Sequence, residues 1–143
     1  MKPSPVGLRF EVKVEAPPAR IWDLLVDVEG WPRWNPGLQF AVLRGDLAIG
    51  SRVDCSVDGM RIRSRVADLD PMRVLGFSLA TIGGTGHARW ELEELGQGWT
   101  RVRLQEEWRG VVVRLLAPTL RRTLEVSRSA ALEGLRRSAE RGG

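Results

Sequence analysis

Residues 87–109 read HARWELEELGQGWTRVRLQEEWR, and this stretch decides the fold. Apolar and charged residues alternate on both sides of the turn Gly96-Gln97-Gly98, as in two antiparallel strands joined by a short loop. Pairing Leu95 with Trp99 across that turn gives one apolar face and one face on which opposite charges meet. A slip by one residue would expose a row of apolar side chains, so the sequence predicts this register.

Two further hairpins precede this one. Asp58-Gly59 predicts a type I′ turn, in which both central residues take positive φ, and that turn places Cys55 opposite Ile62. Residues 70–73 read DPMR, which predicts a type I turn with Asp70 opposite Arg73. The middle of the chain is therefore a series of antiparallel strands.

The N-terminal part predicts a strand followed by short helices. Residues 8–14 alternate apolar and charged, which predicts a strand. Apolar residues at helical spacing from Ile21 to Val28 predict a short helix that Gly30 stops. The proline-rich segment 31–36 predicts a turn or a second short helix, before a strand at 38–43.

After Gly110 the apolar period changes, which predicts one long amphipathic helix with Pro118 at its start or at a kink. The inner face of this helix carries Leu116, Leu120, Leu124, Ser127, Ala131 and Leu135. The arginines fall mostly on its other faces: Arg114, Arg121, Arg122, Arg128, Arg136 and Arg137. The small residues toward its end allow close packing on the sheet or leave a void.

Length and cysteine content bound the architecture. A chain of 143 residues suits one domain with a sizeable core. The single cysteine, Cys55, excludes an internal disulfide, and with the single histidine, His87, it cannot supply a four-ligand zinc site. We therefore expect no metal and no cofactor.

Charge and hydropathy limit the kinds of partner that we expect the chain to bind. The formal charge is only +4, from 22 basic and 18 acidic residues spread along the chain, so we expect no nucleic acid. Arg61, Arg63 and Arg65 share the outer face of one strand, but no aromatic residues interleave with them as in single-strand binders. No apolar run suits a signal peptide or a membrane span, so we expect a cytoplasmic protein without stable membrane insertion.

Three local patterns carry a family resemblance. Ala16-Pro17-Pro18 stands before Ile21-Trp22, the segment 31–36 ends in Trp34-Asn35-Pro36, and Glu106-Glu107-Trp108-Arg109-Gly110 closes the last strand. Together with the order of elements, they resemble the START-related helix-grip superfamily (SRPBCC), and within it the polyketide cyclase/dehydrase and lipid-transport branch. The resemblance implies a single α+β domain over residues 1–143. In that fold, a curved antiparallel sheet of roughly seven strands wraps around a long C-terminal helix, and two short helices follow the first strand.

The resemblance also implies an apolar cavity between sheet and helix, in which different members bind lipids, quinones, hormones or polyketides. The side chains that the registers turn inward combine aromatic and small residues, as a pocket of a few hundred Å³ requires. The candidate ligand-binding residues are Cys55, Ile62, Ser64, Phe77, Leu79, Ala88, Trp90, Leu104, Glu106, Trp108, Leu120, Leu124 and Ser127.

Glu106 is the candidate catalytic residue. Strand alternation turns it inward opposite Ala88, where its carboxylate would contact a ligand hydroxyl or carbonyl, or act as a general acid/base. An equally weighted alternative is that Glu106 pairs with an arginine such as Arg114, or is solvated.

Other residues have simpler interpretations. Cys55 is expected to be an inert buried thiol, because no positive charge surrounds it in the sequence. His87 faces outward beside Glu107. Trp31 and Trp34 would rim the cavity or plug one end of the core, and the plug is favoured.

The leading hypothesis is a binding module for a hydrophobic small molecule, such as a lipid, a quinone or a polyketide. The first alternative is an enzyme of the polyketide cyclase/dehydrase type with Glu106 as general acid/base, and the second is a protein-interaction module with a filled core. One inward ionisable group and the absence of tyrosine favour binding over catalysis. We expect a monomer or a homodimer.

Overall fold

The computed structural model describes residues 6–142, which form one seven-stranded antiparallel sheet packed on helices. The strands are β1 (Val6–Val14), β2 (Leu38–Arg44), β3 (Arg52–Val57), β4 (Met60–Asp70), β5 (Val74–Thr81), β6 (Gly84–Gly96) and β7 (Trp99–Arg109). The helices are α1 (Pro18–Val26), the 3-10 helix η1 (Val28–Arg33), α2 (Val111–Leu115) and α3 (Ala117–Arg141). The predicted α+β architecture, with two short helices after the first strand, is confirmed.

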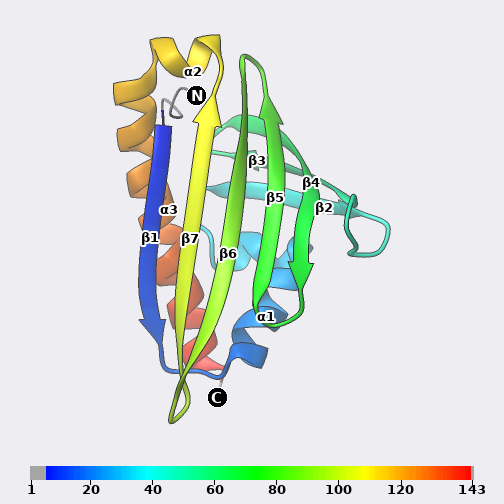
Figure 1. Ribbon diagram of the computed structural model, residues 1–143, viewed down its shortest axis with the longest axis vertical. Helices are drawn as coiled ribbons and strands as arrows, with labels where there is room; N and C mark the ends of the chain where they lie inside the picture. The colour runs from blue at the N-terminus through cyan, green and yellow to red at the C-terminus, as the bar shows by residue number, and fades with distance from the viewer. Residues whose placement is uncertain (1–5, 143) are drawn as a thin grey trace.

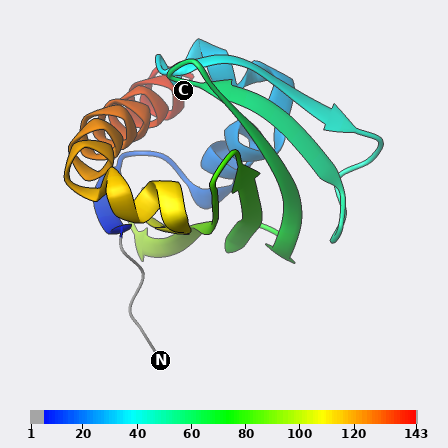
Figure 2. The same cartoon turned by 90° about the horizontal axis from the view of Figure 1, so that it is seen from above.

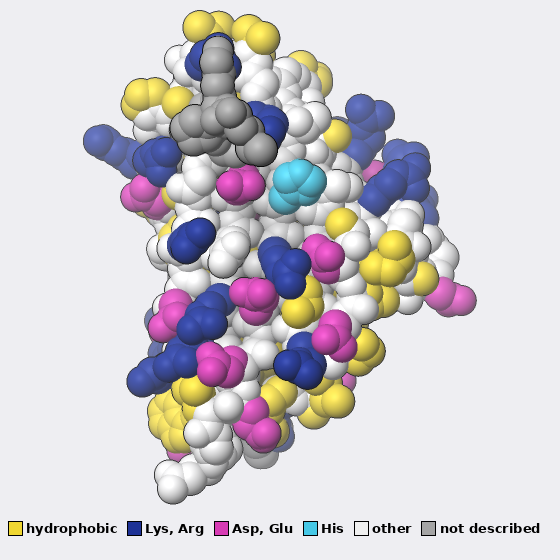
Figure 3. All heavy atoms as spheres, in the orientation of Figure 1, with side chains coloured by type: hydrophobic (Ala, Val, Ile, Leu, Met, Phe, Trp, Pro, Cys, Tyr) yellow, Lys and Arg dark blue, Asp and Glu magenta, His cyan; other side chains and the backbone are white. Residues whose placement is uncertain are grey.

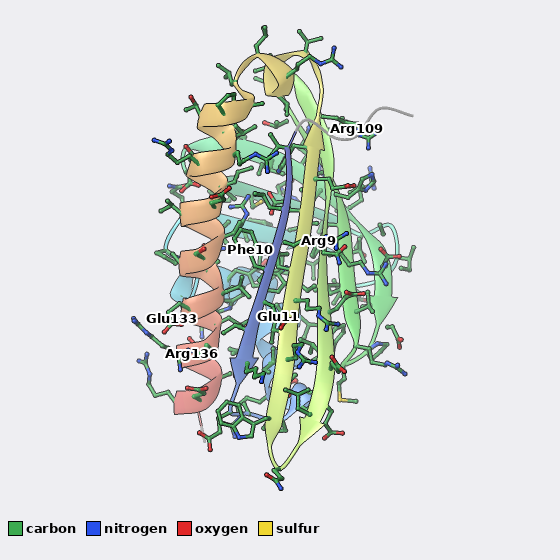
Figure 4. The ribbon with its side chains drawn as sticks, turned by 60° about the vertical axis from the view of Figure 1, so that its left-hand side comes forward. Arg9, Phe10, Glu11, Arg109, Glu133 and Arg136 are labelled. Carbon is green, nitrogen blue, oxygen red and sulfur yellow. The ribbon has the colours of Figure 1, made fainter. Side chains whose placement is uncertain are left out.

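The sheet curves around its helical partners (Figures 1 and 2). Its strand order is β1-β7-β6-β5-β4-β3-β2, so the first strand pairs with the last, Val6 opposite Trp108. Seen from above, α1 and η1 lie within the curve, and α3 runs beside β1 (Figure 2). Phe10 lies on the side of β1 that faces α3, whereas Glu11 lies on the outer side (Figure 4). The apolar core therefore fills the space between the concave face and the helices.

The β3–β4 hairpin has the predicted turn and register. Asp58 and Gly59 have φ angles of 51° and 81°, as a type I′ turn requires of both central residues. Cys55 lies opposite Ile62. The local sequence was sufficient here because few residue types accept two successive positive φ angles.

The β4–β5 hairpin differs from the prediction at its turn. Met72 has a φ of 64°, which a type II turn requires at its third position, so the turn is not type I. Asp70 then lies opposite Val74, and a bulge between Val66 and Asp68 restores the register farther along, where Val66 faces Phe77 as expected from the alternation.

The loop of the β6–β7 hairpin is one residue shorter than predicted. Gln97 and Gly98 both have positive φ and form a two-residue turn, so Gly96, and not Leu95, pairs with Trp99. A register shift between Glu94 and Gly96 absorbs the extra residue. Beyond it the predicted register is confirmed for the rest of the hairpin, including the outward pair of His87 and Glu107.

Proline sets the start of α1, and local packing sets its end and the start of η1. Pro18 occupies the first turn of α1, where its missing N–H costs no hydrogen bond. The helix ends at Val26, before the predicted stop at Gly30, because the chain tightens into η1, in which Gly30 packs against Asp27. The Trp31 indole N–H donates to the Leu25 carbonyl oxygen at 2.8 Å and fixes η1 against α1.

The C-terminal helical region is broken once. The backbone at Leu116 separates α2 from α3, and Pro118 lies in the first turn of α3, which is the first of the two places that the sequence allowed. The buried face of α3 consists of Leu124, Ser127, Arg128, Ala131, Leu132, Leu135 and Ala139. The placement of Arg128 on another face is therefore wrong. Glu133 and Arg136 form an ion pair on the side of α3 away from the sheet (Figure 4).

The outer face of the sheet carries many charged side chains (Figure 3), and several of them form ion pairs. Arg101 donates to Glu93 at 2.7 Å, and Arg103 donates to Glu11 at 2.9 Å, which links three neighbouring strands. Among residues 6–142, no helix combines the length and apolarity needed to cross a bilayer.

Candidate functional site

A buried ion pair joins the sheet to the long helix. Strand alternation in β7 turns Glu106 to the concave face, and helical spacing on α3 brings Arg128 above it. Arg128 Nε donates to Glu106 Oε1 at 2.7 Å, and Arg128 Nη2 donates to Oε2 at 2.9 Å. The Glu106 and Arg128 residues are only 3% and 8% exposed. This two-point geometry is the strongest arrangement that an arginine and a carboxylate adopt.

Two neighbouring side chains also form hydrogen bonds with the pair. Trp108, two residues farther along β7 and thus on the same face, donates its indole N–H to Glu106 Oε2 at 2.6 Å. Arg128 Nη1 donates to Ser127 Oγ at 3.2 Å. The Glu106 carboxylate therefore accepts three hydrogen bonds, and three of the five Arg128 N–H groups have acceptors among the described residues.

The electrostatic balance keeps the arginine charged. Burial by itself lowers the pKa of Arg128, because it penalises the cation, but the adjacent Glu106 carboxylate raises that pKa by charge and by hydrogen bonding, and the net shift is upward. A charged arginine is thus a fixed property of the cavity.

A pocket of about 90 Å³ lies between η1, the sheet and α3. Its wall comprises Trp31, Trp34, Asn35, Leu38, Cys55, Val57, Ile62, Ser64, Phe77, Leu79, Ala88, Trp90, Leu104, Glu106, Arg128 and Ala131. Trp31 of η1 and Trp34, the residue that follows η1, meet sheet aromatics edge to face. The ring centroids lie 5.7 Å apart for Trp31 and Phe77, and 6.0 Å apart for Trp34 and Trp90. These contacts cap the pocket with rigid aromatic rings.

The Trp34 indole provides an unsatisfied donor in this wall. Trp34 is 5% exposed, and its Nε1 has no hydrogen-bond partner among residues 6–142. Buried indole N–H groups normally have an acceptor, and leaving one unpaired costs about 1–3 kcal/mol. Trp31, by contrast, already has the Leu25 carbonyl oxygen.

A second pocket, of about 170 Å³, continues toward α2. It shares Val57, Ile62 and Arg128 with the first pocket, so these side chains stand between the two. Its other walls include Trp108, Val113, Leu120 and Leu124, together with residues at the β5–β6 turn. The space predicted as one cavity of a few hundred Å³ is thus two smaller compartments.

Larger hollows lie outside the core. The largest, about 740 Å³, is on the outer face of the sheet and is lined by charged residues that include Arg101 and Glu93, which pair with each other. Charged side chains form much of its lining, whereas apolar side chains dominate the two inner pockets, so we place the candidate site inside.

The predicted site residues lie in one region. Nine line the first pocket: Cys55, Ile62, Ser64, Phe77, Leu79, Ala88, Trp90, Leu104 and Glu106. Ile62, Trp108, Leu120 and Leu124 line the second. Ser127 lines neither, and its hydroxyl instead accepts from Arg128. Ligand binding by these residues stays a prediction.

Arg128 is the functional residue that sequence reasoning missed. It lies four residues after Leu124 and three before Ala131, both on the inner face, so its spacing was a usable signal. The alternative in which Glu106 pairs with an arginine is confirmed in kind, but the partner is Arg128 and not Arg114. The solvated version is wrong, because Glu106 is only 3% exposed.

Cys55 is buried in the wall of the first pocket, as expected for an inert thiol. Burial raises the pKa of this thiol to about 11, and the nearby Arg128 charge offsets only part of that effect. The thiolate needed for nucleophilic chemistry is therefore scarce near neutral pH.

Comparisons with known proteins agree with this fold. The family model described as polyketide cyclase / dehydrase and lipid transport matches residues 6–140. No curated protein sequence matches the chain. Among solved structures, the Zhui aromatase/cyclase from Streptomyces sp. R1128 is 22% identical, with a TM-score of 0.81 over 94% of this chain and 93% of that chain.

Two other solved structures share the fold. A START superfamily protein from Mycobacterium smegmatis is 21% identical, with a TM-score of 0.70 over 92% of this chain and 97% of that chain. A hypothetical protein from Helicobacter pylori is 18% identical, with a TM-score of 0.80 over 95% of this chain and 89% of that chain. At these identities the structural likeness establishes only the helix-grip fold. The family model matches nearly the whole chain, and the chain therefore belongs to the polyketide cyclase/dehydrase and lipid transport family.

Proposed function

We propose that the chain binds a small, largely apolar molecule that carries a hydrogen-bond acceptor, in the pocket between η1, the sheet and α3. The observation that carries this proposal is the buried Trp34 N–H without a described partner. A ligand carbonyl, hydroxyl or ether oxygen placed beside it would remove the cost of an unpaired buried donor.

Arg128 supports the same ligand chemistry. Its guanidinium has five N–H groups, and the bonds to Glu106 and Ser127 use three of them. The remaining N–H groups belong to a residue that lines both pockets, so an acceptor on the ligand has two kinds of donor within the same wall.

The pocket volume limits what enters. About 90 Å³ is well below the 300–1,000 Å³ of sites for drug-sized ligands, so it suits one ring or a short chain. A lipid, quinone or polyketide-like molecule would insert one such group. A longer molecule would also occupy the second pocket, after a shift of Val57 or Ile62.

The geometry favours binding over the alternative of a cyclase/dehydrase with Glu106 as general acid/base. A general base must be free to take a proton from the substrate, whereas three N–H donors already occupy the Glu106 carboxylate. Arg128 does not release its proton in proteins and cannot serve as the acid. The two pockets also argue against the second alternative, an interaction module with a filled core.

Calorimetric titration with two single-ring probes tests the proposal. Acetophenone carries a carbonyl acceptor and ethylbenzene does not, so acetophenone should bind more tightly. Trp34→Phe should reduce that preference by about three- to tenfold, the value of one hydrogen bond. Trp99→Phe is the matched control, since Trp99 is on the exposed β6–β7 turn.

The proposal fails if neither probe binds saturably, or if Trp99→Phe changes the preference as much as Trp34→Phe. Glu106→Gln should leave acetophenone affinity within about tenfold if the site only binds. Ala88→Leu, which fills the pocket beside Glu106, should abolish binding of both probes, and circular dichroism should show that each variant is folded.

A further inference from the structure

One end of the molecule exposes an apolar surface. The side chains of Ile82, Val111 and Leu115 are 95%, 75% and 75% exposed, and those of Leu116 and Val112 are 55% and 41% exposed. These five residues belong to the β5–β6 turn, to α2 and to the residue after α2. Hydrophobic side chains gather at this end in the space-filling view (Figure 3). Contiguous exposure of large aliphatic residues marks an interaction site more often than chance.

The two segments that form this surface touch each other. A Cβ placed on Gly83, beside Ile82, would lie 2.3 Å from a Val112 side-chain carbon, so the turn packs directly against α2. Ile82, Val112 and Leu116 also line the second pocket. The apolar surface therefore surrounds an entrance to the interior.

The segments that form and flank this surface are rich in arginine and poor in acidic residues. Residues 108–124 contain Arg109, Arg114, Arg121 and Arg122 and no Asp or Glu, and residues 71–90 of the adjoining hairpin also contain no Asp or Glu. Arg109 lies at the α2 end of the molecule (Figure 4). This end thus combines exposed aliphatic groups with a local excess of positive charge.

We propose that this surface, defined by Ile82, Val111, Val112, Leu115 and Leu116, docks on an anionic lipid membrane. The aliphatic side chains would enter the interfacial layer, while Arg114 and Arg122 contact lipid phosphates. A second copy fits less well, because a symmetric contact would bring the arginines of both copies together. An acidic protein partner would satisfy the charges but not the aliphatic centre.

Docking here places the entrance of the second pocket against the bilayer. An apolar ligand would then move between membrane and pocket with little exposure to water, a consequence that rests on the proposed function. The docking itself does not depend on which ligand binds.

Vesicle sedimentation of the full chain tests the docking. The protein should bind vesicles that contain phosphatidylglycerol and phosphatidylcholine, and bind phosphatidylcholine vesicles at least tenfold more weakly. Ile82→Asp and Leu115→Asp should each lower partitioning to anionic vesicles by more than tenfold. Arg114→Gln and Arg122→Gln should each lower it by about fivefold, and added salt should weaken it.

Matched controls are available elsewhere on the chain. Ile49→Asp changes an exposed aliphatic residue in the β2–β3 loop, and Arg63→Gln removes an arginine on the outer face of β4, so neither should change partitioning by more than twofold. Equal binding to neutral vesicles, equal effects of the controls, or a dimer that Ile82→Asp dissociates without any vesicle binding would overturn the proposal.

Acetophenone titration separates this proposal from the proposed function. If the wild-type protein binds acetophenone but not anionic vesicles, the docking surface is wrong and the ligand pocket stands. If it binds vesicles through Ile82 and Leu115 but no probe, the docking surface stands and the ligand pocket is wrong.

Discussion

Gly134 of α3 packs directly on the backbone carbonyl of Trp34. A Cβ built on Gly134 would lie 1.7 Å from the Trp34 carbonyl oxygen, far inside van der Waals contact. Gly134 thus allows close packing, although against the segment that follows η1 and not on the sheet as predicted, and the helix holds in place the tryptophan that closes the first pocket.

Gly134→Ala should destabilise the protein by about 2 kcal/mol, even though alanine is the better helix former, because the methyl group forces α3 away from η1. Urea unfolding measures the loss. Gly7→Ala provides the control, since a Cβ there meets no atom within 4 Å. Equal or greater stability of Gly134→Ala would contradict the close contact.

The Glu106–Arg128 pair predicts a non-additive mutant cycle. Arg128→Met should cost about 3–5 kcal/mol, because it leaves a buried carboxylate without its cation. The double variant Arg128→Met with Glu106→Leu should recover most of that loss in urea unfolding. Additive losses in the double variant would show that the two side chains do not interact.

The Cys55 thiol should react slowly in the folded protein. Because burial raises its pKa to about 11, the rate of reaction with a disulfide reagent should rise about tenfold per pH unit between pH 7 and 9. Unfolding in urea should bring the rate to that of an ordinary cysteine. A fast reaction of the native protein at pH 7 would indicate that the thiol is neither buried nor protonated.

Acid should destabilise the fold through carboxylates on its surface. Hydrogen bonds from Arg103 to Glu11, and from Arg52 to Asp54, hold the pKa of each carboxyl below its ordinary value. A pKa lowered by folding stabilises the protein above the ordinary carboxyl pKa, and this contribution is lost as the pH falls through the folded value. The free energy of unfolding should therefore decrease from about pH 5 downward.

Arg103→Gln should reduce this pH dependence, because Glu11 then loses its main hydrogen-bond donor. Arg9→Gln changes the same charge on the same face without removing a hydrogen bond to Glu11, so it should leave the pH dependence unchanged. Urea unfolding at several pH values compares the two variants with the wild type.

Strand pairing followed from local sequence wherever alternation and turn chemistry agreed. The register that opposes Cys55 to Ile62 depends on one turn type, and it is confirmed. The bulges near Asp68 and Leu95 were not predicted, because they depend on whether Met72 and Gln97 adopt positive φ, which neither residue type favours. Each error is confined to the turn.

The chemistry of the site was only half predictable. Alternation in β7 was enough to turn Glu106 inward. The sequence prediction groups Arg128 with the arginines on the other faces of the helix. Its burial is stable only with the carboxylate opposite, a partner 22 residues away in sequence. The volume of the pockets depends on how the wall side chains pack, which no periodicity records.

The pairing of β1 with β7 has a consequence for how the chain acquires its structure. The hairpins from β2 to β7 contain mostly local contacts and can form as soon as their residues have been synthesised. Val6 pairs with Trp108, so β1 cannot take its place in the sheet before β7 has been synthesised, and α3 follows β7 in the chain. Closing so long a loop is a slow step. Until then the backbone N–H and C=O groups of β1 have no partner strand. Pairing with β7 supplies that partner.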